Sequence, residues 1–113
     1  MKATTISVSI AKPPREVYEF VLQPSNLPHW ASGISADAKV RFAARNELGV
    51  LDHWVTVAPG VEIYAPMRVV ANCAGSELAF TLFRQPDMSD DKFAEDEAWV
   101  RRDLERLKQL LEL

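Results

Sequence analysis

Four runs of alternating apolar and polar residues follow one another in the middle of the sequence, at residues 38–45, 50–57, 61–72 and 77–85. The short turn-forming segments NELG, APG and CAGS separate them. Alternation places successive side chains on opposite faces of a strand, and connections of this length join neighbouring antiparallel strands. The pattern therefore predicts an antiparallel meander with one apolar face.

The three turns predict pairing registers that agree with one another. A slip of one residue would move the apolar side chains of a whole strand to the other face, and none of the three turns requires such a slip. Pro66 is the weak point, because proline has no N–H to donate to a neighbouring strand and often accompanies a bulge. The expected partners are Val40 with Val55, Phe42 with His53, His53 with Ala65, Trp54 with Tyr64, Val55 with Ile63, Val57 with Val61, Met67 with Leu82 and Val69 with Phe80.

These registers predict which side chains face the interior. Asp52, Trp54 and Thr56 alternate with the inward positions, so we expect them to face outward. Asp52 and His53 then point to opposite faces, and they cannot form an acid–imidazole pair with each other. The predicted inner face carries Phe42, Leu51, His53, Val55, Ile63, Ala65, Met67, Val69, Phe80 and Leu82.

Helices are predicted on both sides of the meander. Residues 4–10 alternate as a strand, and apolar residues at helical spacing then run from Pro14 to Gln23. A short corner at residues 26–33, marked by proline and glycine, follows. The segment from Ser89 onward has no Gly or Pro and predicts a long helix with Ser89 as its N-cap. We expect one apolar stripe of this helix to cover the inner face of the sheet: Phe93, Val100, Leu104, Leu107 and Leu111.

The net charge of −3 is distributed unevenly along the chain. Residues 1–86 carry 8 basic and 7 acidic groups, and residues 87–113 carry 5 basic and 9 acidic groups. No basic cluster is present, so nucleic-acid binding is not expected. In the last helix, acidic residues at the start and basic residues later match the helix dipole. This match explains the excess of acidic groups in residues 87–113 better than an acidic tail that binds a partner would.

Length and composition predict a single domain, residues 1–113, with no cofactor or metal. A chain of 113 residues with 48% hydrophobic and 26% charged residues is typical of one compact domain. Cys73 is the one cysteine, which excludes an internal disulfide and a multi-cysteine metal site. The N-terminal segment lacks the continuous apolar stretch of a signal peptide, and no run reaches the roughly 20 apolar residues of a membrane span, so we expect a cytoplasmic protein.

The order of a strand, two short helices, a meander and a long helix requires the apolar face of the sheet to pack against that helix. Two stretches carry this order: ISVSIAKPPREVYEFVLQPSNLPHW and ELAFTLFRQPDMSDDKFAEDEAWVRRDLERLKQLLE. With them the chain resembles the START-like, helix-grip superfamily often labelled SRPBCC, which includes Bet v 1-like and polyketide cyclase/dehydrase-like proteins. The resemblance covers nearly the whole chain and implies an α+β fold, with a curved antiparallel sheet wrapped around the C-terminal helix. It also implies a cavity between sheet and helix that holds apolar or partly polar small molecules.

Within such a cavity, His53 is the best candidate for a polar contact, because it is predicted on the inner face. The alternative is a neutral core histidine that is hydrogen-bonded to a backbone carbonyl or a water. Trp30, in the corner, either lines the entrance or plugs the core. Arg84 either holds a ligand carboxylate at the cavity rim or pairs with the acidic start of the last helix. No catalytic residue is assigned, and the predicted ligand-binding residues are Trp30, Phe42, His53, Val55, Ile63, Met67, Phe80, Leu82, Val100 and Leu104.

The function expected first is the binding of a small hydrophobic or amphipathic molecule, such as a lipid, in this cavity. One alternative is an enzyme of the cyclase or dehydrase type that uses His53, and it requires a second polar group close to that imidazole. Another is a homodimer that forms through the outer face of the sheet, where Trp54, Tyr64 and Phe83 make an aromatic stripe. The dimer alternative predicts a filled core.

Overall fold

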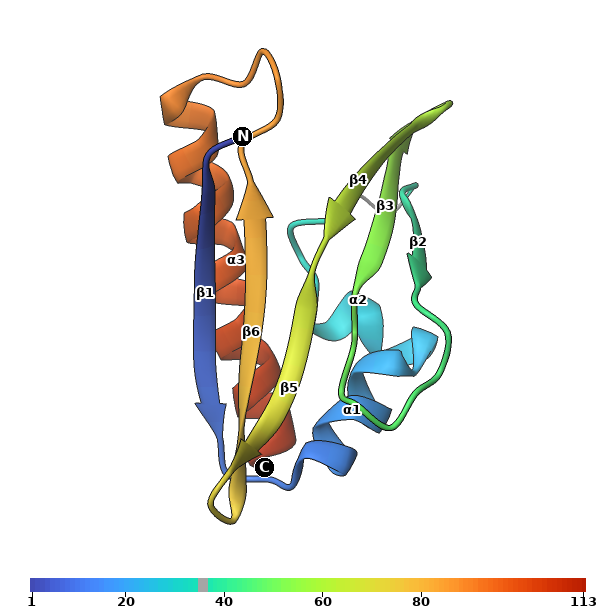
Figure 1. Cartoon of the computed structure of the whole chain (residues 1–113), viewed down its shortest axis with the longest axis vertical. Helices are drawn as coiled ribbons and strands as arrows, with labels where there is room; N and C mark the ends of the chain where they lie inside the picture. The colour runs from blue at the N-terminus through green and yellow to red at the C-terminus, as the bar shows by residue number, and fades with distance from the viewer. Residues whose placement is uncertain (35–36) are drawn as a thin grey trace.

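The structure is a computed structural model that describes residues 1–34 and 37–113. It has the predicted order of a strand, short helices, a meander and a long C-terminal helix (Figure 1). The elements of the described chain are β1 (Ala3–Ile10), α1 (Pro14–Leu22), the 3₁₀ helix η1 (Pro24–Asn26), α2 (Leu27–Trp30), β2 (Lys39–Phe42), β3 (His53–Ala58), β4 (Val61–Ala65), β5 (Met67–Asn72), β6 (Gly75–Phe83) and α3 (Asp90–Leu111).

The strands form two antiparallel sheets that meet at Pro66. One sheet has the order β1-β6-β5 and the other has the order β2-β3-β4, with Pro66 between β4 and β5. The residues before β3 join the sheets, because Val50 bridges to Arg68 and the N–H of Leu51 donates to the carbonyl of Met67 at 2.8 Å. Beyond Pro66, β4 bends away from β6 (Figure 1). The result is one curved surface that is split at one end.

The predicted registers are confirmed on both sides of β3. The confirmed pairs are Val40 with Val55, Phe42 with His53, His53 with Ala65, Trp54 with Tyr64 and Val55 with Ile63. The expected pairing of Val57 with Val61 is wrong, because an irregularity after Thr56 sets Ala58 opposite Val61. The irregularity lies at the end of the hairpin and leaves the rest of the inner face unchanged.

The predicted register of β5 against β6 is wrong by two residues. Met67 lies opposite Phe80 rather than Leu82, and Val69 is displaced in the same way. The turn has the predicted two residues but lies one residue earlier, at Cys73 and Ala74 rather than at Ala74 and Gly75, because Asn72 pairs with Gly75. Cys73 adopts a φ of 53°, a left-handed conformation that suits such a turn. A slip of two residues keeps each side chain on its predicted face, so the assignment of faces is confirmed.

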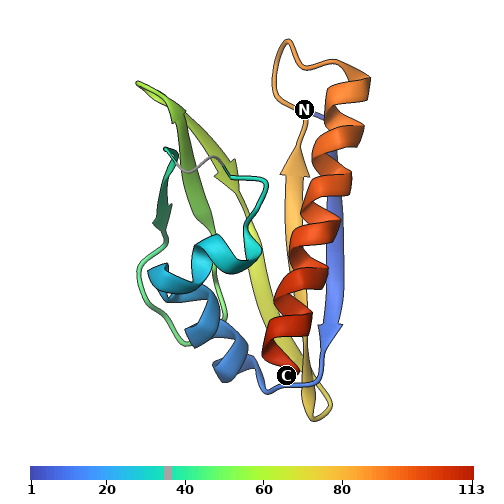
Figure 2. The ribbon, with the colours of Figure 1, turned by 180° about the vertical axis from the view of Figure 1, so that it is seen from behind.

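Helix α3 lies along β1 and β6 and covers the inner face of the sheet (Figure 2). Ser89 is its N-cap, as predicted, and its hydroxyl oxygen accepts a hydrogen bond from the N–H of Lys92 at 3.0 Å. None of the helices in the described part of the chain is long and apolar enough to cross a membrane. The buried core joins the C-terminal half of α3 to α1 and the sheet, and includes Ile6, Ile10, Val17, Val21, Leu51, Met67, Val69, Leu78, Leu104, Leu107 and Leu111.

Candidate functional site

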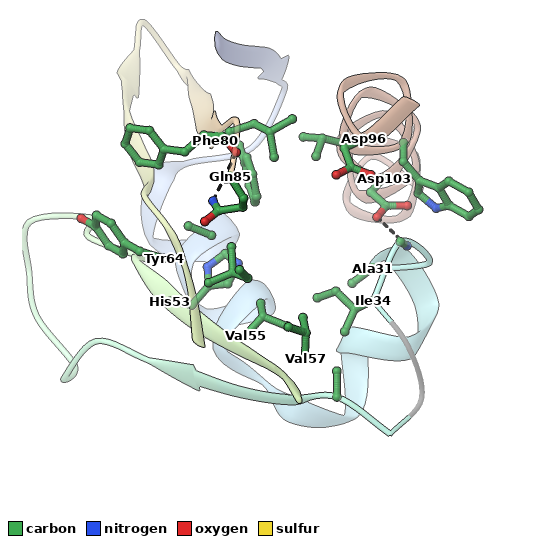
Figure 3. A pocket seen from close by; sticks show the side chains of 18 of the residues that line it. Ala31, Ile34, His53, Val55, Val57, Tyr64, Phe80, Gln85, Asp96 and Asp103 are labelled. Carbon is green, nitrogen blue, oxygen red and sulfur yellow. Dashed lines mark hydrogen bonds between the residues drawn. The ribbon is translucent and has the colours of Figure 1, made fainter. Parts of the chain in front are cut away.

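A cavity of about 560 Å³ lies between the inner face of the sheet and α3. Figure 3 shows His53 and Val55 of β3 on one side of it and Asp96 and Asp103 of α3 on the other. Ligand pockets in proteins typically measure roughly 300–1,000 Å³, so this cavity has the size of a small-molecule site. The predicted ligand-binding residues that line it are Trp30, His53, Val55, Ile63, Phe80, Leu82, Val100 and Leu104.

Phe42 and Met67, the other residues predicted to bind a ligand, do not line the cavity. Met67 is fully buried in the core, where its pairing with Phe80 places it below the split in the sheet. Phe42 is half-buried, and its ring centroid lies 5.1 Å from that of His53. We therefore expect these two side chains to support the cavity wall from behind.

The cavity extends into the gap between β4 and β6. Neighbouring residues of a strand point to opposite faces, yet both Leu82 and Phe83 line the cavity, and so do both Ile63 and Tyr64. Residues from both faces reach one cavity only where the two strands are unpaired. Because Pro66 has no N–H to continue the ladder, the strands diverge from that point and the gap opens.

His53 lies on the inner face, as predicted, and is 2% exposed. Its Nδ1 is 3.0 Å from the carbonyl oxygen of Leu51, so Nδ1 carries the proton of the neutral ring and Nε2 carries the lone pair. Burial lowers the pKa of the imidazole, against the smaller opposing effects of the Leu51 carbonyl and the Asp52 carboxylate. His53 is thus both a hydrogen-bonded core histidine, as one alternative predicted, and a neutral acceptor in the cavity wall.

Asp52 does not face solvent as expected; it lies on the outer side of the sheet but is 6% exposed. Its carboxylate accepts hydrogen bonds from Tyr64 Oη at 2.8 Å, from the N–H of Met67 at 2.9 Å, and from Arg68 Nε and Nη2 at 3.0 and 2.9 Å. The Arg68 guanidinium is the main cause that lowers the pKa of Asp52 to about 2. These bonds connect β4 and β5 across Pro66, where the strand ladder is interrupted.

Asp103 closes the cavity between α3 and the loop after α2. It is 8% exposed, and its carboxylate accepts from the N–H and hydroxyl of Ser32 at 3.2 and 2.6 Å and from the N–H of Gly33 at 3.0 Å. The indole N–H of Trp99 donates to the same Ser32 hydroxyl at 3.1 Å. A Cβ on Gly33 would lie 2.7 Å from the Trp99 ring, so this close approach favours glycine.

Trp30 plugs the interior beside this loop. It is 4% exposed, joins the core and also lines the cavity. Its indole N–H is buried without a hydrogen-bond partner among the described residues. Trp30 is therefore buried in the core, as the plug alternative expected, and it also forms part of the cavity wall. Its contact with a ligand stays a prediction.

The predicted aromatic stripe is present on the outer face of the sheet. The Trp54 and Tyr64 rings stack with centroids 5.3 Å apart, and those of Tyr64 and Phe83 stack at 6.3 Å. The guanidinium of Arg41 lies 4.5 Å from the Trp54 ring centroid and covers part of it. Tyr64 is 39% exposed, whereas Trp54 and Phe83 are half-buried. The stripe is thus a partly covered apolar surface, and dimerisation through it stays a prediction.

The sequence reasoning missed the polar part of the cavity. Lys92, Glu95, Asp96 and Asp103 line it from α3, although only the apolar stripe of that helix was expected to face inward. The available signal was spacing: Asp96 and Asp103 lie four residues before and three residues after Val100, so all three share one face of the helix. Among the described residues, no group of three or more His, Cys, Asp or Glu side chains is placed to hold a metal ion.

The sheet is curved and split, it wraps around a long C-terminal helix, and a cavity lies between the two. This arrangement identifies the architecture. The chain has the helix-grip fold. Comparison with protein-family models gives no match, and comparison with curated proteins gives none either. The helix-grip resemblance seen in the sequence is confirmed by solved structures.

Three of the solved structures illustrate this similarity. DynU16, a protein of the dynemicin biosynthetic locus, superposes with a TM-score of 0.78 at 16% identity, over 99% of this chain and 48% of its own. An AHSA1-like protein from Rhizobium etli gives 0.71 at 16% identity, over 98% and 82%. Ara h 8.0201 gives 0.67 at 10% identity, over 97% of each chain. This helix-grip chain therefore spans about half the length of DynU16, and the low identities show a shared fold only.

Proposed function

We propose that this helix-grip protein binds a small, largely apolar molecule in the cavity between its sheet and α3. The observation that carries the proposal is the cavity itself, about 560 Å³ with a mostly apolar lining and a buried imidazole in its wall. Protein interiors are normally packed as densely as organic crystals, so a space of this size in a chain of 113 residues is unusual. Apolar cavities favour apolar guests over water, because water there lacks hydrogen-bond partners.

The polar groups of the lining fit binding better than catalysis. A general acid or base works best with a pKa near neutrality, whereas burial lowers the pKa of His53 and keeps it neutral. The adjacent carboxylate, that of Asp52, points to the other face and is engaged by Arg68 and Tyr64. His53 therefore supports the recognition of a hydroxyl or N–H group more directly than it supports a cyclase or dehydrase reaction.

The test is a fluorescence titration with N-phenylnaphthylamine, a neutral dye that becomes bright in apolar sites. We expect saturable binding with one dye per chain. Val55→Trp, which fills the cavity, should weaken that binding at least about tenfold, because the guest loses its space. Thr56→Phe is the matched control, since Thr56 neighbours Val55 on the same strand but does not line the cavity. Absence of saturable binding to the wild-type protein, or equal weakening by both variants, would overturn the proposal.

A second candidate function is homodimerisation through the outer face, and the aromatic stripe of Trp54, Tyr64 and Phe83 favours it. The filled core that the sequence analysis attached to this alternative is contradicted by the cavity. The aromatic stripe itself lies mainly on the outer face, opposite most of the cavity, so a dimer through the stripe and binding in the cavity are compatible. Trp54→Glu places a charge in the stripe and should convert a dimer to a monomer in sedimentation velocity, while Thr5→Glu, on β1, should not. Identical sedimentation of wild type and Trp54→Glu as one species would remove this candidate.

A further inference from the structure

The charged side chains at the cavity come mainly from one face of α3. Among the described residues that line it, the carboxylates are Asp37, Glu95, Asp96 and Asp103, and the ammonium group is Lys92. The positions on α3 are three or four residues apart, which explains why they share the side that faces the cavity. Figure 3 shows Asp96 and Asp103 across the cavity from His53. The helix side of the cavity is therefore net negative.

The positive charge of Lys92 is already neutralised by its own helix. Its Nζ lies 2.7 Å from Asp96 Oδ1 and 4.0 Å from Glu95 Oε1. Arg84, which the sequence suggested as an alternative holder of a ligand carboxylate, donates instead to Asp90 Oδ1 and the Met88 carbonyl, both at 2.9 Å. Arg84 does not line the cavity. Neither cation is thus placed to receive an anionic ligand.

Asp103 adds a buried negative charge. The hydrogen bonds that it accepts come from neutral donors, the Ser32 N–H and hydroxyl and the Gly33 N–H. Neutral donors stabilise a carboxylate without cancelling its charge, and charges interact more strongly across an apolar cavity than across water. A carboxylate or sulfonate in the cavity would therefore be repelled by Asp103, whereas an ammonium group would be attracted.

The opposite wall of the cavity, formed by the sheet, also favours a ligand group that donates a hydrogen bond over an anion. His53 donates from Nδ1 to the Leu51 carbonyl, so its Nε2 is an acceptor. An ionised carboxylate or sulfonate has no hydrogen to donate to this nitrogen, whereas an alcohol or an amine has one. Both polar walls therefore select hydrogen-bond donors and oppose anions.

The helix dipole does not reverse this selection. A helix N-terminus attracts anions through its exposed N–H groups. In α3, however, the Ser89 hydroxyl accepts from the N–H of Lys92, and Asp90 and Asp91 occupy the first turn. The cavity meets the side of α3 from Lys92 onward.

We propose that the cavity selects neutral or cationic amphipathic molecules that carry a hydrogen-bond donor, such as alcohols and amines, and excludes anionic ones. This inference rests on the proposed function, because it names the ligand class of the same cavity. It distinguishes the protein from a carrier of fatty acids, whose head group is a carboxylate.

The test uses two dyes that share one aromatic skeleton, N-phenylnaphthylamine and its sulfonated form, anilinonaphthalene sulfonate. We expect the sulfonate to bind at least about tenfold more weakly than the neutral dye, because it places an anion beside a helix wall that carries three carboxylates and one ammonium group. In competition with the neutral dye, decylamine should displace it at a lower concentration than decanoate of the same chain length. Equal affinities of the two dyes, or stronger displacement by decanoate, would overturn the charge selection.

A charge variant tests whether α3 causes the selection. Glu95→Gln combined with Asp96→Asn removes two carboxylates from the cavity and releases Lys92, so the preference for the neutral dye should shrink several-fold. Glu97→Gln combined with Glu105→Gln is the control, because it makes the same change of charge on α3 at residues that do not line the cavity. Equal effects of the two pairs would contradict the assignment to these residues. If the wild-type protein binds neither dye, the proposed function itself fails, whereas equal binding of both removes only the charge selection.

Discussion

The two ends of the interior differ in how completely they are filled. At one end, β5 pairs with β6 and α1 packs on both strands, and Leu51, Met67 and Leu78 are each 0% exposed. At the other end, β4 leaves β6, and Val55 and Leu82 are half-buried around a cavity. The boundary between them is Pro66. The comparison teaches that the cavity exists because the chain changes its strand partner at Pro66: β4 pairs with β3, whereas β5 pairs with β6. The apolar residues before and after Pro66 are similar.

The largest expected effect compares two leucines on the inner face of β6. Leu78→Ala should destabilise the protein by about 2–5 kcal/mol, because the surrounding packed core cannot close the space that is left. Leu82→Ala should cost about 1 kcal/mol, since Leu82 borders an existing cavity and is only half-buried. Urea unfolding of both variants measures the difference. Equal losses would show that the two ends of the interior are packed alike.

The next effect concerns the carboxylate that connects the strands at the boundary. Asp52 has a pKa of about 2 in the folded protein against an ordinary value of 3.8. Its ionised form therefore stabilises the fold above pH 3.8, and this contribution is lost as the pH falls from 3.8 toward 2. Asp52→Asn should lower the free energy of unfolding at pH 7 by about 2 kcal/mol and reduce the loss of stability in this acidic range.

Glu62→Gln is the control for this change, because Glu62 forms an exposed pair with Arg41 at 3.4 Å. An exposed ion pair contributes about 0–1 kcal/mol, so the control should remain close to wild type. Urea unfolding at pH 7 and in the acidic range provides both measurements. The interpretation of Asp52 as a connection across Pro66 would be contradicted by a variant that is as stable as this control.

The smallest effect concerns the imidazole of His53, which lies in the wall of the cavity. Burial lowers the folded-state pKa of His53 below its ordinary value of 6.5, so the unfolded chain binds a proton at a pH where the folded protein does not. Stability should therefore fall as the pH drops below 6.5, down to the folded-state pKa. Thermal unfolding from pH 7.5 to 5 should show this decline in wild type and in His29→Asn, whose side chain is exposed, but less of it in His53→Phe. Parallel curves for all three proteins would mean that another group is responsible.

The position of His53 shows how much of the site was predictable. Its place on the inner face followed from alternation and from two turns whose registers agreed, and the structure confirms both pairings. The register of Met67 was wrong, because the exact turn at Cys73 depends on a left-handed backbone conformation that alternation does not reveal. The registers placed Arg68 diagonally from Asp52 on the outer face, where a surface ion pair was expected. The burial of Asp52 was missed, because strand alternation gives the face of a side chain but not the donors, Tyr64 and Arg68, that cover it there.

The acidic wall of the cavity was the least predictable part of the site. Charged residues on a helix normally face solvent, so Glu95 and Asp96 gave no reason to expect otherwise. Their contact with the cavity depends on the space that β4 leaves when it turns away from β6. Asp103 in turn depends on the loop at Ser32 and Gly33, about 70 residues earlier in the chain.

By itself, the sequence determined the order of the elements, the inner and outer faces of the strands, and the long helix that covers them. These properties depend on periodicity and capping within short segments, so local residue patterns are sufficient to predict them. Only the tertiary structure decided that one end of the interior stays hollow and that carboxylates of α3 line it. The volume left between a sheet and a helix depends on the paths of strands that lie far apart in the sequence. A residue pattern within one short segment therefore cannot predict it.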